Sequence, residues 1–203
     1  NFVDRQLLVI LSEPIKDELG LQDWQLGLLT GLAFAALYVV LGLPIARYAD
    51  NNNRKNVVAA SLAIWSAMTA ISGQAQSFIQ LLLARVGVGI GEAGGSPPAH
   101  SIISDYFPPE KRATALSIYS TGIYIGIFVG YLGGGAIAAS YGWRMAFYAI
   151  GIPGVLFSVL IYATIKEPVK GTLDKHKVNT DETPLREVLS TLLSKKTFVY
   201  LAL

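Results

Sequence analysis

Residues 78–103 read FIQLLLARVGVGIGEAGGSPPAHSII, an apolar stretch that contains two charged residues, Arg85 and Glu92. A helix needs about 20 apolar residues to cross the roughly 30 Å hydrocarbon core of a bilayer, and this run is long enough. A charge inside such a span costs at least about 2.5–3.5 kcal/mol, so it marks a position with a partner or a task. The stretch therefore predicts a membrane helix with a functional polar interior.

The remainder of the chain has the composition of a membrane protein. Of its 203 residues, 52% are hydrophobic and only 15% are charged, whereas soluble domains carry about 25% charged residues. Four further apolar spans run approximately over 25–45, 56–72, 113–139 and 145–165. The net charge of +2 is too small to indicate a nucleic-acid partner, and the absence of cysteine excludes disulfides and zinc ribbons. We expect neither a metal nor a cofactor.

Both ends of the chain read as parts of longer structures. Residues 1–12 are apolar but too short to cross a membrane, so we expect the outer part of a truncated first helix. Residues 197–203 begin another apolar run. The expected organisation is an amino-terminal transmembrane bundle over 1–165, a cytoplasmic inter-bundle linker over 166–196 and the start of the carboxy-terminal bundle over 197–203.

The linker contains one helical pattern. Thr183 and Pro184 form an N-cap and first-turn signal. Five apolar residues with helical spacing follow it: Leu185, Val188, Leu189, Leu192 and Leu193. The pattern predicts an amphipathic helix over about 184–196. This helix either lies at the cytoplasmic membrane face and joins two bundles or packs on the surface with no role of its own.

The distribution of lysine and arginine predicts the orientation. The loops at 47–55, 105–112 and 166–196 fall on one side of the membrane and hold twelve of the sixteen basic residues. The other side holds Lys16 and Arg144, and the last two basic residues lie inside spans. Because basic residues accumulate in cytoplasmic loops, these three loops are expected in the cytoplasm.

Four charged residues fall inside predicted spans: Asp4, Arg5, Arg85 and Glu92. Arg85 and Glu92 are seven residues apart, so they share one helix face and lie roughly 10 Å apart along the axis. Counting from the outer helix ends puts the Asp4–Arg5 pair at a depth between them. Two positive and two negative groups at matching depth predict a neutralised cluster in the interior of the bundle.

The cluster has two interpretations. It could be a buried ion-pair network that only fixes helix packing, although such pairs are a costly source of stability. It could instead line a water-accessible cavity, where Glu92 binds and releases a proton with assistance from Asp4. Arg5 and Arg85 would then hold an anionic group or form the ion pairs that the substrate replaces.

Glycines form a second pattern in the span at 113–139, where they recur every four residues at Gly122, Gly126, Gly130 and Gly134. Such a stripe lets helix backbones approach closely, so these residues are expected to serve helix packing. The glycines around Glu92 do not predict a nucleotide site, because they lie inside a span and not between a strand and a helix.

The turn at residues 46–55 reads ARYADNNNRK. It resembles the signature between the second and third helices of the major facilitator superfamily, Gly-x-x-x-Asp-Arg-x-Gly-Arg-Arg/Lys. Asp50, Arg54 and Lys55 match, whereas Ala46, Asn51 and Asn53 depart from the signature. Arg85 with Gly89 resembles the fourth-helix signature, and PEKR at 109–112 resembles the loop before the fifth helix.

Three further stretches look like the spinster-like branch of that superfamily: NFVDR at 1–5, GIGEA at 89–93, and SDYF at 104–107 followed by Arg112. The resemblance extends to about residue 168. It implies the six-helix amino-terminal bundle of a twelve-helix, all-α integral membrane fold, with the first helix truncated and the start of the seventh present. It also implies that Asp4, Arg5 and Glu92 line a central cavity.

The same resemblance implies a function. It suggests a monomeric, proton-coupled secondary transporter in a bacterial inner membrane, which moves a lysophospholipid or a sphingoid phosphate-like lipid by alternating access. Membrane lipids and protons are its other expected partners. A drug or organic-anion transporter of the same superfamily is the alternative.

Two further expectations concern particular residues. Asp50, Arg54 and Lys55 are expected to form a cytoplasmic gate, with Arg54 in an inter-helix ion pair; the alternative is a solvated turn that only sets topology. A membrane lipid hydrolase would use Glu92 and His100 on a helix bent by Pro97 and Pro98. The sequence holds no Gly-x-Ser-x-Gly elbow or metal-ligand spacing, so no catalytic residue is expected.

Overall fold

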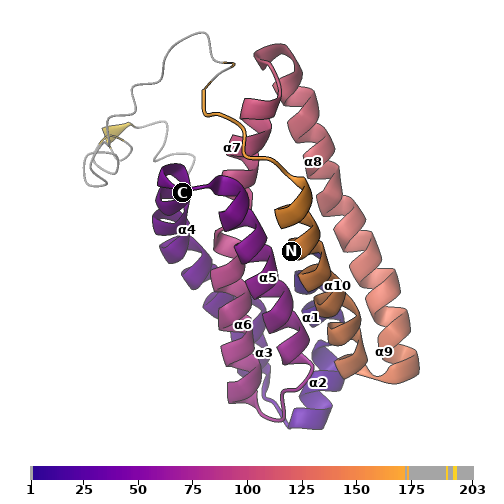
Figure 1. Ribbon diagram of the computed structural model, residues 1–203. Helices are drawn as coiled ribbons and strands as arrows, with labels where there is room; N and C mark the ends of the chain where they lie inside the picture. The colour runs from indigo at the N-terminus through magenta and orange to yellow at the C-terminus, as the bar shows by residue number, and fades with distance from the viewer. Residues whose placement is uncertain (1, 172, 174–190, 192–193, 196–203) are drawn as a thin grey trace. The chain divides into compact units, whose positions relative to one another are not determined.

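The computed structural model describes residues 2–171, 173, 191, 194 and 195, without the side chains of 32–37 and 39. Over these residues all regular secondary structure is helical (Figure 1). The α-helices are α1 (Phe2–Ile10), α2 (Ser12–Leu19), α3 (Asp23–Gly27), α4 (Ala33–Asn51), α5 (Arg54–Ser72), α6 (Phe78–Ala93), α7 (Ser96–Tyr106), α8 (Pro109–Val129), α9 (Gly135–Tyr141) and α10 (Trp143–Thr164). Two π-helical turns, η1 (Leu28–Leu32) and η2 (Gly130–Gly134), join α3 to α4 and α8 to α9.

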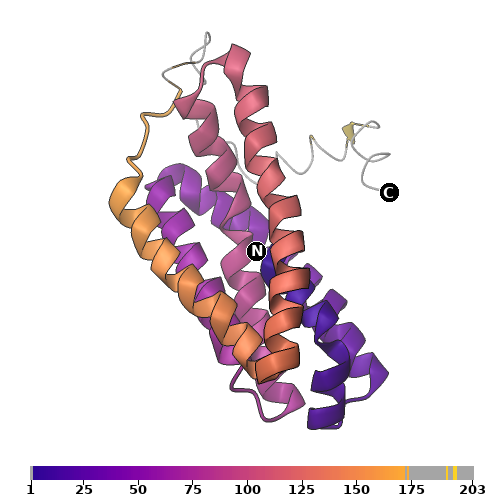
Figure 2. The same ribbon diagram turned by 90° about the vertical axis from the view of Figure 1, so that its right-hand side faces the viewer.

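The helices run up and down between two ends (Figures 1 and 2). The turns between α4 and α5 and between α7 and α8 lie at one end, where α10 also finishes; we call this the gate end. The turns from α2 to α3, α5 to α6 and α9 to α10 lie at the opposite end. The three loops with most of the basic residues thus begin at the gate end, which is the end predicted to be cytoplasmic.

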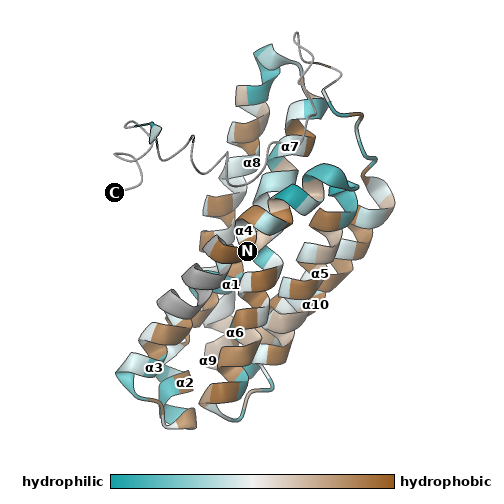
Figure 3. Cartoon of the chain, turned by 90° about the vertical axis from the view of Figure 1, so that its left-hand side faces the viewer, coloured by the Kyte–Doolittle hydropathy of each residue, from teal (hydrophilic) through white to brown (hydrophobic). Residues whose placement is uncertain are grey.

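All five predicted spans are helical, but the span at 78–103 is interrupted between α6 and α7, and those at 25–45 and 113–139 each contain a π-helical turn. By length and composition alone, three helical stretches among the described residues are apolar enough to cross a membrane: Phe78–Tyr106, Pro109–Tyr141 and Trp143–Thr164. Figure 3 shows hydrophobic residues along the middle of the helices and hydrophilic ones gathered at both ends. This distribution is the one expected of a bundle that lies across a bilayer.

The helix that was expected to bend at Pro97 and Pro98 is interrupted just before these two residues. The helix ends at Ala93 and restarts at Ser96, so the break falls at Gly94 and Gly95. Both prolines occupy the first turn of α7, where a helix does not need their missing N–H groups.

Close contact between α5 and α10 forms one side of the bundle. A Cβ built on Gly151 would lie only 2.5 Å from the Ala70 nitrogen and 2.7 Å from the Ser66 carbonyl oxygen. Only glycine permits this approach of the two backbones.

The glycine stripe has two environments. A Cβ on Gly130 would lie 3.2 Å from the Val3 carbonyl oxygen, and one on Gly134 would meet the Leu7 side chain. Gly126 also faces the start of α1, at ordinary contact distance. A Cβ on Gly122, in contrast, would meet no atom within 4 Å. Three glycines therefore lie against α1, and Gly122 faces open space.

The chain divides into two compact units, residues 1–173 and 174–203. The first unit includes the segment after α10, where the Tyr106 hydroxyl donates to the Lys166 carbonyl oxygen at 2.6 Å. The amphipathic helix predicted at 184–196 and the bundle start predicted at 197–203 lie outside the described residues, apart from Thr191, Ser194 and Lys195.

Candidate functional site

The structure brings the four predicted interior charges together from α1 and α6. The Arg5 guanidinium donates to Glu92 Oε2 from Nε at 3.0 Å and from Nη2 at 2.6 Å. Glu92 is fully buried, whereas 35% of the Arg5 side chain is exposed. The pair thus joins an enclosed carboxylate to a cation that can still be reached from outside.

The second pair is less directly bonded. Asp4 and Arg85 are both buried and carry opposite charges that attract each other. The Arg85 guanidinium lies 5.6 Å from the centre of the Phe147 ring. Within the described part of the chain, Arg85 Nε and Nη2 and Glu92 Oε1 are buried without a hydrogen-bond partner. This cluster is therefore balanced in charge but has unused donors and an unused acceptor.

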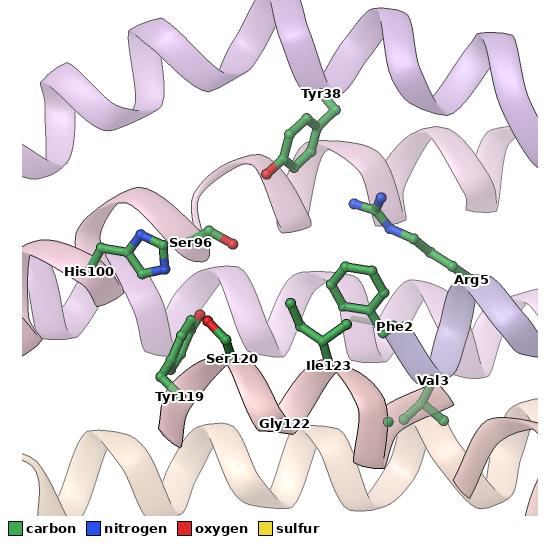
Figure 4. Close-up of a pocket in the computed structure, with 11 residues that line it drawn as sticks. Phe2, Val3, Arg5, Tyr38, Ser96, His100, Tyr119, Ser120, Gly122 and Ile123 are labelled. Carbon is green, nitrogen blue, oxygen red and sulfur yellow. The ribbon is translucent and has the colours of Figure 1, made fainter. Parts of the chain in front are cut away.

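A cavity of about 420 Å³ adjoins the cluster (Figure 4). Its polar lining comes from α1, α4, α7 and α8: Arg5, Tyr38, Ser96, His100, Tyr119 and Ser120. Its apolar lining is Phe2, Val3, Gly122, Ile123 and Gly126. The Arg5 guanidinium is also 5.5 Å from the centre of the Tyr38 ring, and its charge thus faces an aromatic wall.

Among the four charged residues, Arg5 lines this cavity, while Asp4, Arg85 and Glu92 do not. The expectation that Arg85 touches a ligand therefore has no contact geometry in its favour. Its place beneath Phe147 agrees better with the other role considered for it, as a member of an interior ion pair. Arg5 alone connects the cavity with the buried carboxylate.

Sequence reasoning missed most of the cavity lining. Tyr38, Ser96, Tyr119 and Ser120 are ordinary residues of apolar spans, and no spacing sets them apart. For His100 the sequence suggested either a partner in hydrolysis or a residue at a helix end near the cytoplasmic mouth. It lies within α7 and lines the cavity.

A separate polar network lies at the gate end around Arg54, which is only 1% exposed. Its guanidinium contacts Asp105 at 2.5 Å and Glu167 at 2.7 Å. It also donates to the Ser101 hydroxyl at 2.8 Å and to the Pro168 carbonyl oxygen at 3.0 Å. The start of α5 is thereby tied both to α7 and to the segment after α10.

The other predicted gate residues lie beside this network. The Lys55 backbone N–H donates to Glu167 at 2.8 Å, and its ammonium lies 4.8 Å from the centre of the Tyr162 ring. Asp50 is exposed at the end of α4. Burial opposes the charge on Arg54, but hydrogen bonds from Arg54 to Glu167 and Asp105 outweigh it and raise the Arg54 pKa above its usual value. Arg54 therefore remains charged, as its two carboxylate partners require.

Comparison with known families agrees with this geometry. The profile of the Major Facilitator Superfamily matches residues 1–203, and the chain belongs to this superfamily. It is spinster-like: a crystal structure of a bacterial homolog to the human lysosomal transporter Spinster, inward-facing and unoccupied, superposes with a TM-score of 0.83 and 38% identity. The match covers 97% of this chain and 47% of that one.

Two further relatives are described as transporters of different kinds. An MFS-type efflux pump of Mycolicibacterium smegmatis is 41% identical over 165 residues, which cover 81% of this chain and 38% of the pump. The hexuronate transporter of Bacillus subtilis is 27% identical over 207 residues, which cover 100% of this chain and 48% of that transporter. The chain thus spans between about a third and a half of the length of these relatives.

The comparisons confirm the superfamily, the spinster-like resemblance and the multi-pass membrane fold that the sequence predicts. The relatives named above are described as transporters and as an efflux pump, and none of them is described as a hydrolase.

Proposed function

We propose that this chain forms the part of a secondary transporter that binds an amphipathic organic anion and couples its movement to protons. The observation that carries the proposal is the position of Arg5, which lines the cavity and at the same time holds the buried Glu92 carboxylate. A single cation thus serves both an external ligand and an internal acid.

Competition for Arg5 supplies the coupling. An anionic ligand that takes the guanidinium leaves Glu92 as a buried charge without its partner. Such a charge is costly, so proton uptake by Glu92 accompanies ligand binding. The fully buried Asp4–Arg85 pair holds the surrounding charge in balance while Arg5 changes partner. In this proposal Glu92 is the principal proton-binding group, and Asp4 assists it.

The lining of the cavity favours an amphipathic ligand. Phe2, Val3 and Ile123 offer apolar surface, and Arg5 offers a planar cation that suits phosphate or carboxylate. A lysophospholipid or a sphingoid phosphate-like lipid has both properties, and the spinster-like resemblance supports this choice. A sugar acid is the second candidate, because the cavity also has Tyr38, Ser96 and Ser120 hydroxyls and a hexuronate transporter is a relative.

Transport by the full-length protein in liposomes tests the proposal. We expect a labelled lysophosphatidylglycerol to be taken up faster with a pH gradient, and excess unlabelled lysolipid to compete better than glucuronate. Arg5→Lys keeps the charge but loses the two-pronged grip on the anion, so the affinity should fall about tenfold. The matched control is Arg144→Lys, which changes an arginine bonded to Glu18 at the opposite end.

Uptake that is equal in Arg5→Lys, Arg5→Gln and the control would overturn the proposal. If only glucuronate competed, the proposal of a transporter would stand, but its substrate would be a sugar acid and not a lipid.

The gate end is proposed to face the cytoplasm of a bacterium whose inner membrane holds the protein. The three loops that hold most of the basic residues begin at this end, and this supports the orientation. Asp50, Arg54 and Lys55 are proposed to act there as a gate, because the buried Arg54 network ties three segments together.

A further inference from the structure

His100 is a titratable residue of the cavity that the proposed coupling leaves unused. It lies on α7, and its imidazole packs edge to face with Tyr119 of α8, with ring centres 5.1 Å apart and an interplanar angle of 82°. Figure 4 shows the imidazole at the far side of the cavity from Arg5, with Tyr38 and Ser96 between them. The aromatic contact orients the ring without occupying either of its nitrogens.

The polar edge of the imidazole is available to a ligand. His100 is exposed, and no hydrogen bond or ion pair is found between it and another residue in the described part of the chain. Because the side chain is exposed, its nitrogens can bond water or a ligand without displacing another protein group. Here the nitrogens stay free in a cavity that already contains a cation.

The charged and titratable groups around His100 determine whether a positive charge on its imidazole would be neutralised. The helices that pack against α7 present Tyr38 from α4 and Tyr119 from α8, while Arg54 of α5 is bound to Asp105 farther along α7. Across the cavity lies Arg5 of α1. No carboxylate is among the described residues that line the cavity. Protonation of His100 would therefore add a second positive charge that no neighbouring acid neutralises.

We propose that His100 is a second anion-binding group of this cavity, which contacts the ligand directly and makes binding of anionic ligands tighter as the pH falls. The inference rests on the proposed function, since it assumes that ligands enter this cavity. It differs from the Glu92 coupling, because the proton stays on a group that touches the ligand. Histidine is suited to this task since its charge changes between about pH 5 and 8.

The test measures binding of two lysolipids to the full-length protein from pH 5.5 to 8. Lysophosphatidylglycerol carries one negative charge over this range, and lysophosphatidylcholine carries no net charge. In the wild-type protein we expect the affinity for the anionic lipid to rise about tenfold from high to low pH, which is the worth of one charge-assisted hydrogen bond. The affinity for the zwitterionic lipid should change far less.

Two variants of His100 separate binding from structure. His100→Gln keeps a polar side chain that cannot become charged, so most of the pH slope for the anionic lipid should disappear, and only the part that Glu92 supplies should remain. His100→Lys keeps a positive charge at all these pH values, so tight binding should persist at pH 8. Glu92→Gln should leave most of the slope intact.

A slope in His100→Gln as steep as in the wild-type protein, or an affinity of His100→Lys at pH 8 that equals the wild-type value, would overturn the inference. These results are distinct from failure of the proposed function, in which Arg5→Gln would bind the anionic lipid as well as the wild-type protein does at every pH.

Discussion

Replacement of Arg54 by alanine is expected to destabilise the bundle more than any loss of an exposed ion pair. The guanidinium is 1% exposed and bonds Asp105 and Glu167, whose side chains are 9% and 23% exposed. Removing one member of a buried ion pair costs about 3–5 kcal/mol, because its partners keep their charge without compensation. Glu167 can turn partly to water, so we expect the lower end, about 3 kcal/mol.

Thermal unfolding of the full-length protein in detergent, followed by tryptophan fluorescence, measures this loss. About 3 kcal/mol corresponds to a fall in Tm of about 6–12 °C for 150–250 residues and to a smaller fall for a longer protein, so we expect a decrease of a few degrees. Arg54→Lys should recover part of it, since an ammonium is a compact charge that cannot keep the guanidinium's several directed hydrogen bonds at once.

The matched control is Lys16→Gln, which removes an equally short ion pair with Asp23 at 2.5 Å. The Asp23 side chain is 88% exposed, and pairs in water contribute little. No measurable change in Tm is expected for this variant. If Arg54→Ala lowered the Tm no more than the control does, the reasoning from burial would be refuted.

Three further outcomes are expected. Glu92→Gln keeps the shape of the side chain but cannot titrate, so proton-driven uptake should be lost while substrate exchange without a gradient continues. If this variant kept full gradient-driven uptake, a residue other than Glu92 would have to carry the proton. Gly151→Ala should lower the Tm by several degrees, because overpacking costs about 1–3 kcal/mol. The control Gly135→Ala places its methyl group in open space and should leave the Tm unchanged. Equal melting curves for the two variants would contradict the argument that α5 and α10 are in close contact at Gly151. Asp50→Asn should shift the distances across the gate end, measured by double electron–electron resonance, and unchanged distributions would leave the turn with a topological role only.

Hydropathy was sufficient to locate the helices, because the bilayer imposes a length on each apolar run. Counting residues from the helix ends also predicted that the Asp4–Arg5 pair lies at a depth between Arg85 and Glu92. Depth is set within each helix by a rise of 1.5 Å per residue, so it can be calculated from the sequence.

The choice of partners within the cluster could not be predicted in this way. Arg85 and Glu92 share one face of α6, so either of them could pair with the oppositely charged residue of α1. The rotation of α1 decides between them, and contacts of α1 with Gly126 of α8 and Gly130 of η2 constrain it. Arg85 instead lies against the Phe147 ring of α10 and is not part of the cavity lining. These are contacts between distant segments, which no local pattern in the chain records.

The polar character of α5 has a consequence for how the protein enters the membrane. This helix is not among the three that are apolar enough to cross by themselves, and four of its hydroxyl-bearing residues are buried: Ser61, Ser66, Thr69 and Ser72. The close approach of α10 at Gly151 shields part of this surface from lipid. Because α5 is synthesised well before α10, it must wait for its partner in a protected environment. We therefore expect α5 to stay at the translocation machinery and to enter the bilayer with α10 as a pair.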